Sequence, residues 1–540
     1  NELISPEEIL HSFKTIKPKK AVGSDLISNE MLICSQDIIV PYLTTLFQYL
    51  FNNGIYPDCW STSTIIPILK KGDSGLCTNY RPISLTSLVS KLYTGIINNR
   101  IKLYLDYNNI ICKEQGGYRE GHSPIEHIFT LYGCVNKQFS KNRKLYAAFV
   151  DYKCCFDSVS REGLFHILTK IGINGKLFNA IKSIYNNVLA CVRSNDEMSE
   201  LFSCPTGLKQ GCLCSPSLFL IFINELSIAL NINGKHGIQL ISGSESLFHL
   251  LFADDSLLLS DTITGLQNQL NILNNQSTRL GLDVNLSKTK IVVFRKGGFL
   301  SRYEKWTYNN EPLQVVNSYK YLGVDFTTRL SFNNLTSSFV SKAKQACYGI
   351  LSSLKKIECY DLDVFTKLFD TKVKPILLYA SELWGCCDFV EIEKVHLFAL
   401  KRFLNISLHA SNTLVYGESG RYPLHVCSKL RALKFWFKIT KYPNERIVNM
   451  TYRMLSNLDS DGYTNWVSNV RNMLCENGYA YVWLFQSVGC EKTFLFNFKQ
   501  TLIDSYKQGW HDKLINGEHF EFYSSFKTII DKEKYLCQHF

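Results

Sequence analysis

The sequence predicts a mixed α/β protein whose last third is mostly helical. Up to about residue 330, short strand-like apolar runs bounded by turn residues alternate with segments of helical periodicity. Beyond that point, apolar residues recur with the helical period over long segments. The chain has 540 residues, of which 46% are hydrophobic and 20% are charged, so it can build large cores in about three or four domains.

The composition favours some partners and compartments over others. The net charge of +12 favours a polyanionic partner such as nucleic acid, although many basic proteins bind none. The 19 cysteines have no framework spacing and no leader peptide precedes them, so we interpret them as reduced, buried thiols of an intracellular protein. The longest apolar stretch, around residues 218–223, is too short to span a bilayer, and we expect no membrane partner.

The chain opens with a helix and a basic loop. Ser5 fits an N-cap, Pro6 fits the first helical position, and the acids that follow suit the first turn. Apolar residues then recur with helical spacing up to Ile16. The lysine-rich segment 17–25 is either a solvated linker or a contact for nucleic acid.

The next segment predicts a basic hairpin. Two short β-rich runs, at residues 65–69 and 79–85, bracket a turn. A hairpin would place Lys70, Lys71 and Arg81 side by side, and such a set of cations suits a triphosphate. A basic surface hairpin without a ligand is the alternative.

A glycine-rich loop at residues 115–123 precedes an expected helix at 125–139. Glycine removes side-chain bulk, so this loop could approach a nucleic-acid backbone closely. It is not a nucleotide-binding P-loop, because the Gly-Lys-Ser/Thr ending is absent.

Residues 145–150 predict a buried strand that ends at Asp151. A carboxylate at a strand end is held rigidly and stays open to solvent, which suits a ligand for a hard cation. A helix is expected near 161–170, and Asp157 before it is better explained as an N-cap or turn residue.

A Gly-x-x-Gln-Gly string at residues 207–211 leads into an apolar helix at about 218–228. Its glycines leave room for a base pair or a sugar, and the Gln210 amide offers both a donor and an acceptor. A tight turn before a core helix explains the glycines as well, but it leaves Lys209 and Gln210 unexplained.

The adjacent aspartates Asp254 and Asp255 lie between the apolar runs 247–252 and 257–259, as in the turn of a β-hairpin. On its own, such a pair is usually ordinary turn chemistry. The elements expected after it are a helix at 262–280 that ends at Gly281, a strand at 291–294, a hairpin that ends at 319–324, and long helices at 341–356 and 394–406.

The carboxylates indicate a reaction when they are taken together. Asp151 and the Asp254-Asp255 pair are about 100 residues apart, and they meet if their strands are neighbours in one sheet. Nucleotidyl transfer uses two Mg²⁺ ions about 3.5–4 Å apart to activate a 3′-hydroxyl and to stabilise departing pyrophosphate. Mg²⁺ keeps several waters, so a few carboxylates suffice as ligands. Cations of an opposing hairpin would neutralise the triphosphate.

In their order along the chain, these motifs resemble those of reverse transcriptases from non-LTR (LINE-type) retrotransposons. The motifs are Lys70-Lys71-Gly72-Asp73, Asn79 through Leu85, Gly117-Tyr118-Arg119, Asp151 through Asp157, Gly207 through Gly211, Phe252-Ala253-Asp254-Asp255, Asn285 through Lys290 and Tyr321-Leu322-Gly323. The resemblance covers about residues 1–330. It implies a right-hand polymerase with α/β fingers and palm, an antiparallel palm sheet and a helical thumb. The implied domains are an N-terminal helical extension at 1–55, fingers at 56–145, palm at 146–328, thumb at 329–410 and a C-terminal helical region at 411–540.

The resemblance also implies roles for single residues. Asp151, Asp254 and Asp255 would be the catalytic residues and the ligands of two Mg²⁺ ions, for which Mn²⁺ could substitute, with the backbone carbonyl of Tyr152 as a further ligand. Phe156 would exclude a ribose 2′-hydroxyl, and Lys288 would donate a proton to pyrophosphate. The implied dNTP-binding set is Lys70, Arg81, Phe156, Gln210 and Lys288, and the implied primer and template set is Lys209, Gly211, Tyr321, Leu322 and Gly323.

The activity implied by the resemblance is RNA-directed DNA polymerase, with an RNA template, a DNA primer or target DNA, and dNTPs as partners in the nucleus and cytoplasm. Proteins of this family usually carry an endonuclease, and we expect none in this chain. Cys154-Cys155 stands where Lys-Ala is usual, and Tyr118 where Phe is usual. An inactive retroelement remnant that binds RNA or DNA is therefore the alternative. A maturase, a telomerase and a palm-like nucleotide cyclase each fit fewer of the motifs.

Overall fold

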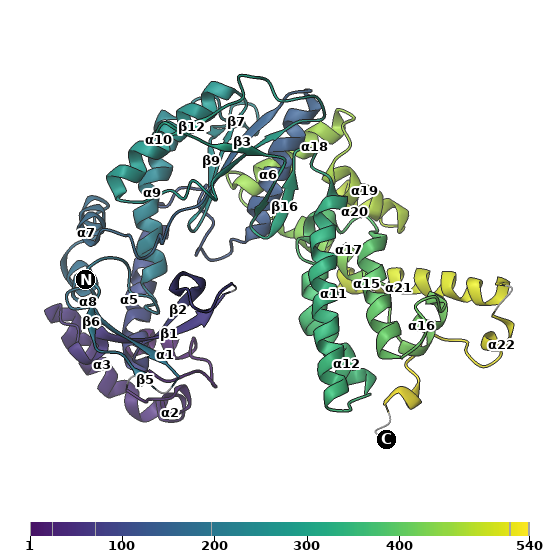
Figure 1. Cartoon of the computed structure of the whole chain (residues 1–540), viewed down its shortest axis with the longest axis horizontal. Helices are drawn as coiled ribbons and strands as arrows, with labels where there is room; N and C mark the ends of the chain where they lie inside the picture. Colours follow the sequence, from purple (N-terminus) through teal and green to yellow (C-terminus); the bar gives the residue numbers. More distant parts are fainter. Residues whose placement is uncertain (1, 24, 71, 196, 518–519, 538–540) are drawn as a thin grey trace.

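The structure, a computed structural model, describes residues 2–23, 25–70, 72–195, 197–517 and 520–537. Its elements form an open arch (Figure 1). The helix α3 (Gln36–Asn53) lies toward one end, the strand β3 (Leu145–Val150) near the top, and the helix α11 (Phe332–Lys356) along the other side.

The first end of the arch combines N-terminal helices with a small sheet. Ser5 caps α1 in a capping box with Glu8, as the sequence predicts, and Arg100 forms an ion pair with Glu8. The strand order is β2-β1-β4-β5, and β6 pairs with β4. The elements are α1 (Pro6–Phe13), α2 (Asn29–Cys34), α3, α4 (Asp58–Ser61), β1 (Thr62–Leu69), β2 (Tyr80–Leu85), α5 (Leu88–Tyr107), α7 (Arg161–Lys170), α8 (Gly175–Ile184), β4 (Leu189–Ser194), β5 (Glu197–Met198) and β6 (Phe202–Ser203).

The top of the arch is a five-stranded sheet with the order β14-β11-β3-β10-β9, in which only the β11–β14 pair is parallel. Helices cover both of its faces, which is why every residue of β3 is buried. The elements are α6 (Pro124–Ser140), β3, α9 (Ser215–Asn233), β9 (His249–Phe252), β10 (Asp255–Ser260), α10 (Ile263–Leu280), β11 (Lys290–Phe294) and β14 (Gln314–Val316). Short two-stranded ribbons flank it: β7 (Ile238–Gln239) with β8 (Ser246–Leu247), β12 (Thr307–Tyr308) with β13 (Glu311–Pro312), and β15 (Ser318–Tyr321) with β16 (Val324–Thr327).

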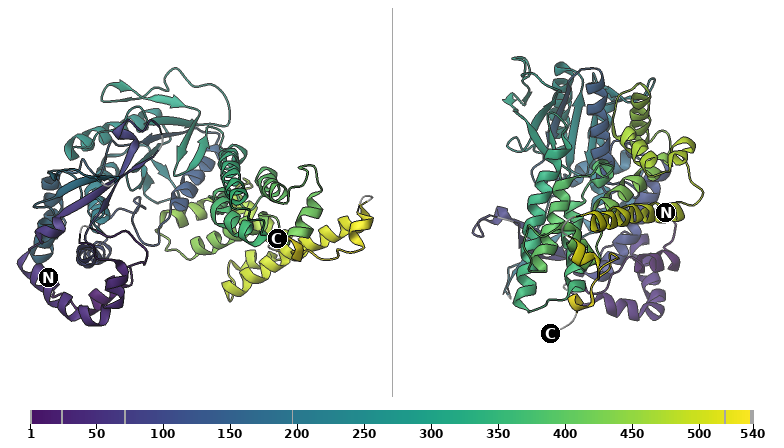
Figure 2. Two further views of the ribbon diagram at one scale, coloured as in Figure 1. Left: turned by 60° about the horizontal axis from the view of Figure 1, so that its bottom comes forward. Right: turned by 90° about the vertical axis from the view of Figure 1, so that its right-hand side faces the viewer.

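Alternation along β3 divides its side chains between two cores. Tyr146 and Ala148 pack with α9 and α10, whereas Ala147 and Phe149 pack with α6 and with helices from the C-terminal part of the chain. The helices α17 (His425–Thr440), α18 (Ile447–Ser460) and α19 (Trp466–Glu476) therefore complete the core of this sheet. Figure 2 shows these helices beside α6 and the long α21 (Glu491–Asn516) projecting away from the arch.

The remaining helices form a separate core at the other end of the arch. They are α11, α12 (Leu362–Leu368), α13 (Lys374–Leu377), α14 (Ser381–Trp384), α15 (Val390–Phe403) and α16 (Asn412–Ser419), and the smaller C-terminal helices are α20 (Ala480–Phe485) and α22 (Glu521–Ser524). The expected helices at 341–356 and 394–406 correspond to α11, which begins nine residues earlier, and to α15, which lies at Val390–Phe403.

Two expectations from composition need correction. The helix expected at 218–228 runs from Ser215 to Asn233, long and apolar enough to cross a membrane by length and composition, but 72% of its most apolar window is buried inside the protein. Among the cysteines whose side chains the structure describes, all of which are free, several are exposed instead of buried, including Cys34 and Cys154. The helix expected at 262–280 is confirmed as α10, which Thr262 caps and Gly281 ends in the left-handed region.

Candidate active site

The sheet brings the three predicted catalytic aspartates together. β3 and β10 are antiparallel neighbours, and the pair Ser256–Val150 continues by one residue to place Asp255 opposite Asp151. Asp254 follows Ala253 in the two-residue turn between β9 and β10. Loss of solvation, followed by the charges of Asp254 and Asp151, raises the pKa of Asp255 to about 6. Repulsion of this kind is what a bound cation would relieve.

The turn that carries Asp254 is clamped by Gln115. Gln115 Oε1 accepts hydrogen bonds from the backbone amides of Ala253 (3.1 Å) and Gly117 (2.8 Å), and the amide of Gly116 donates to Leu251 O (2.8 Å). Ala253 has a φ of 58°, a strained value for a residue with a Cβ, so the clamp holds an otherwise unfavourable turn. Sequence analysis did not assign Gln115 a role.

Gly116 and Gly117 of this loop allow close packing, a role that the sequence did not indicate, whereas contact of the loop with a nucleic-acid backbone stays a prediction. A Cβ on Gly116 would lie 2.3 Å from His127 Nε2, and a Cβ on Gly117 would lie 2.1 Å from the amide nitrogen of Ala253. Both positions therefore require glycine so that the loop can reach the catalytic turn.

A second loop, residues 285–289, fixes Asp151. The amide of Asn285 donates to Asp151 O (2.7 Å), and Thr289 Oγ1 accepts from the amide of Asp151 (3.3 Å). Lys288 Nζ lies 3.2 Å from Asp151 Oδ2. The backbone of Asp151 is thus held on both sides, and its side chain carries a single cationic neighbour from this loop.

The donor set fits a hard divalent cation that keeps some of its water. Among the residues that the structure describes, no three His, Cys, Asp or Glu side chains gather closely enough to hold a metal ion by themselves. Asp151 Oδ2 is shielded from solvent and lies 3.2 Å from the Lys288 ammonium, which shows that this oxygen can face a positive charge. Mg²⁺ binds through one or two carboxylates, waters and substrate phosphates, so this arrangement can accept it.

The predicted basic hairpin is formed by β1 and β2. Ile68 pairs with Arg81, and Lys70 donates its amide to Asn79 O (2.9 Å), so the side chains of Lys70 and Arg81 lie diagonally on one face. Both are exposed, whereas Lys71 lies outside the described residues. Burial raises the pKa of Tyr118. The charge of Asp254 raises this pKa further and the charge of Arg81 lowers it, so both charges lie within electrostatic reach of the phenol.

Phe156 stands between the catalytic strand and the apolar helix α9. Its ring stacks on Phe219 at 4.5 Å and meets the edge of Tyr118 at 6.0 Å. Gln210 Nε2 donates to Asp157 Oδ1 (3.0 Å), which joins the Gly-x-x-Gln-Gly loop to the segment after Asp151. Of the two roles expected for Asp157, the turn residue is confirmed and the N-cap is not, because Ser160 caps α7.

Lys209, which we expected to contact primer or template, is buried instead. Lys209 is 4% exposed, donates to the carbonyl of Trp60 (2.5 Å) and faces the ring of Tyr56, so its ammonium supports the fold. Burial lowers its pKa to about 8. A Cβ on Gly211 would lie 2.8 Å from Ser84 O, so a side chain here would meet β2, while contact of the exposed Gly211 with primer or template stays a prediction.

The hairpin β15–β16 lies against the same carboxylates. Tyr319 stacks on Phe149 at 4.4 Å, and burial together with the charges of Asp151 and Asp255 raises the pKa of Tyr319 to about 12. Tyr321 is 3% exposed, so its side chain belongs to the core and cannot contact a primer. Leu322 and Gly323 form the turn, where Tyr379 Oη donates to Leu322 O (2.6 Å).

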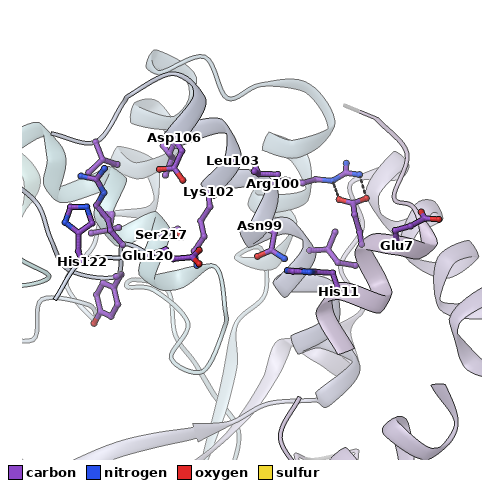
Figure 3. A pocket seen from close by; sticks show the side chains of 17 residues that line it. Glu7, His11, Asn99, Arg100, Lys102, Leu103, Asp106, Glu120, His122 and Ser217 are labelled. Carbon is purple, nitrogen blue, oxygen red and sulfur yellow. Dashed lines mark hydrogen bonds and ion pairs between the residues drawn. The ribbon is translucent and has the colours of Figure 1, made fainter. Parts of the chain in front are cut away.

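A cavity of about 530 Å³ lies beside the site, between α1, α5, α9 and residues 118–122. Figure 3 shows His11 of α1 near Asn99 of α5, with Glu120 and His122 of the loop farther along the same wall. The lining mixes both signs of charge and contains none of the three aspartates. This cavity is therefore separate from the three predicted catalytic carboxylates.

The raised pKa of Asp255, caused first by loss of solvation and then by the neighbouring charges, should be measurable as a stability difference. Folding raises this pKa from 3.8 to about 6, so the stabilisation from binding a proton is complete below about pH 4 and is lost as the pH rises through about 6. D255N, which is always neutral, should unfold at a higher temperature than the wild type at pH 7.5, with little difference at pH 4. Thermal unfolding at both pH values tests this. D157N is the control, and its unfolding temperature should match that of the wild type at both pH values. Equal unfolding temperatures at pH 7.5 would contradict the prediction.

Comparison with known proteins shows what part of the chain is similar to. Residues 68–326 match the family described as reverse transcriptase (RNA-dependent DNA polymerase). The RNA-directed DNA polymerase from mobile element jockey of Drosophila funebris is 26% identical over 415 residues, 75% of this chain and 44% of that protein. The Pol polyprotein from type-1 retrotransposable element R2 of Popillia japonica is 26% identical over 426 residues, 77% of this chain and 57% of that protein. The chain thus spans about half the length of these relatives.

Among solved structures, apo telomerase from Candida tropicalis is similar with a TM-score of 0.39 and 13% identity, over 77% of this chain and 74% of that one. Telomerase from Candida albicans gives a TM-score of 0.37 and 12% identity, over 79% and 69%.

Proposed function

We propose, from the reverse-transcriptase domain that residues 68–326 form, that this chain is the polymerase part of a LINE-type retroelement protein. It would copy an RNA template into DNA by extending a primer 3′-hydroxyl with dNTPs. The observation that carries the proposal is the β3–β10 register, which sets Asp255 opposite Asp151 with Asp254 in the adjoining turn. Jockey and R2 proteins are the relatives that motivate the choice of element.

The aspartates would hold the divalent cations. Asp151 and Asp254 would be the principal ligands, and Asp255 and the carbonyl of Tyr152 would complete the set. Two bound Mg²⁺ ions supply activation of the attacking hydroxyl and charge stabilisation at the leaving pyrophosphate. Lys288, which pairs with Asp151 Oδ2 in the structure, would exchange that partner for a phosphate and donate a proton to the leaving group.

The fingers and the aromatic wall would select the nucleotide. Lys70 and Arg81, on one face of the β1–β2 hairpin, would neutralise the triphosphate. Phe156, fixed between Phe219 and Tyr118, would occupy the space that a 2′-hydroxyl needs. Gln210 would lie by the new base pair, where its bond to Asp157 sets its orientation.

The direct test is primer extension on an annealed RNA template and DNA primer with dNTPs and Mg²⁺. We expect extension that stops when EDTA removes the metal and that runs to the template end when Mg²⁺ is restored. Absence of extension by a folded protein that still binds the template and primer would reject the polymerase and leave the remnant, which binds nucleic acid without polymerising.

Binding of template and primer should weaken steeply with salt. The chain has a net charge of +12, and the exposed hairpin with Lys70 and Arg81 offers cations for phosphates. With about 6–10 phosphate contacts, release of counterions predicts a fall in affinity of about 10³-fold or more between about 50 and 200 mM salt. Fluorescence anisotropy across that range measures it, and replacing Arg81 by Gln should reduce the slope by about one. A flat profile would show that phosphates do not dominate binding.

A further inference from the structure

The loop that clamps the catalytic turn is itself held from behind by the C-terminal helices. Arg446 Nη2 donates to Gly121 O (2.7 Å) and to Glu126 Oε2 (2.7 Å), and Arg446 Nε donates to the same carboxylate oxygen (3.2 Å). Tyr442 Oη lies 3.0 Å from Glu126 Oε1 and 3.3 Å from Gly121 O. The guanidinium of Arg446 stacks on the ring of Tyr442 at 3.7 Å.

Glu126 makes this contact strong, because its charge is buried. The residue is 4% exposed, and Lys438 Nζ at 3.5 Å is its third partner. Removing one partner of a buried ion pair leaves an uncompensated charge, which costs far more than the loss of a surface pair. Residues 121–126 are therefore fixed to α17 and to the segment before α18 by a contact that has a large free-energy cost to break.

The segment 115–127, which Arg446 and Tyr442 hold at one end, also contacts the turn that carries Asp254. His127, next to Glu126 on α6, packs its ring against Phe252 at 5.5 Å and lies directly under Gly116. Five residues before Gly121, Gly116 pairs with Leu251 O, and Gln115 holds the amide of Ala253. A short chain of direct contacts thus leads from Arg446, through the 115–127 segment, to the turn that carries Asp254.

α18 can approach closely because α6 has a glycine at the crossing. A Cβ on Gly133 would lie 2.3 Å from Thr451 Cγ2. The helices are therefore in direct contact at this point, so α18 packs closely against the helix that carries Glu126 and His127.

We propose that Arg446 and Tyr442 are positioning residues for the catalytic turn. They fix Gly121 and Glu126, and through them the Gln115 clamp on Ala253. The C-terminal helices α17 and α18 are then a structural part of the catalytic centre. The catalytic meaning of the turn rests on the proposed function, whereas the mechanical link between Arg446 and Ala253 does not.

Amide hydrogen exchange tests the link without requiring activity. In R446M, exchange of the amides of Gly116, Gly117 and Ala253 should become about tenfold faster, because the loop loses its anchor while the hydrophobic contacts remain. Y442F, which removes only a hydroxyl, should change the same amides in the same direction by less. R446K, which keeps a cation beside Glu126, should restore part of the protection.

R471A is the matched control. Arg471 pairs with Asp459 at 2.7 Å, the carboxylate has a side chain 6% exposed, and both residues lie in the C-terminal helices away from the 115–127 segment. It should destabilise the protein without accelerating exchange at Ala253. Unchanged exchange in both R446M and Y442F, or equal acceleration in R471A, would overturn the proposal. Should R446M fail to fold, Y442F and R446K alone decide the outcome.

Kinetics then separates the inference from the proposed function. If the wild type extends a primer, R446M should lower kcat by about 10- to 100-fold and raise the Mg²⁺ concentration for half-maximal rate, with little change in KM for the template and primer. If the wild type does not extend a primer, the proposed function fails, and the exchange result still decides the positioning role. A change in KM alone would reject positioning.

Discussion

D254N should abolish primer extension, with a loss of about 1,000-fold or more, equal to about 4 kcal/mol of transition-state stabilisation. Asp254 is exposed in the turn after Ala253, so the isosteric amide changes the charge without disturbing any packing. An amide oxygen is a poorer ligand for Mg²⁺ than a carboxylate, and the variant would keep Asp151 as its one principal ligand, so the cation would be bound more weakly. Single-turnover extension of a saturating template and primer measures the chemical step directly.

D157N is the control for this substitution. Asp157 is another exposed carboxylate close to the site, and its amide variant can still accept the hydrogen bond from Gln210 Nε2. It should extend primers within about tenfold of the wild type, because it contributes no charge to the metal site. Retention of wild-type extension by D254N, in protein freed of contaminating polymerase, would exclude the proposed metal site.

F156A should change which sugar is accepted more than how fast DNA is made. The Phe156 ring of the wild type is held by stacking on Phe219 and by the edge of Tyr118, and replacing it with Ala leaves an open volume at that point. We expect the preference for dNTPs over rNTPs to fall by about 100-fold, equal to about 2.7 kcal/mol, chiefly through better use of rNTPs. Measuring kcat/KM for matched dNTP and rNTP pairs gives the ratio.

F165A controls for general loosening near this wall. Phe165 is half-buried, lies on α7 and pairs with Phe178 at 6.0 Å, outside the group of residues around the aspartates. It should lower stability without altering the choice of sugar. If F156A and F165A changed the ratio equally, the effect would come from loss of packing and not from a wall against the 2′-hydroxyl.

Sequence patterns predicted those parts of the fold and the site that depend on residues close together in the sequence. The apolar run before Asp151, the turn around Asp254 and the capped, glycine-ended α10 follow from residue types at short spacing. That β3 and β10 are neighbours was a conditional expectation, and the register confirms it. Predicting that the aspartates meet therefore required the pairing of β3 with β10, which the sequence suggested but could not establish.

Side chains whose role depends on distant partners were misjudged. Lys209 was expected to meet nucleic acid, but it donates to Trp60 O, 149 residues away, and no local pattern announces that partner. The role of Gln115 depends on Ala253, 138 residues away. Tyr321 lies on a short ribbon whose buried face is set by the neighbouring sheet, so alternation alone could not assign it.

The pairing of Glu126 with Arg446 has a consequence for how the protein is made. The two residues are 320 positions apart, so at about 5–20 residues per second α6 leaves the ribosome about 15–60 s before its partner helix exists. The strands of the central sheet are made within that interval, and from then until α17–α19 follow, the face of the sheet that these helices cover is open to solvent. The nascent chain should therefore depend on holding chaperones over this period, and a ribosome stalled before residue 446 should carry an aggregation-prone intermediate.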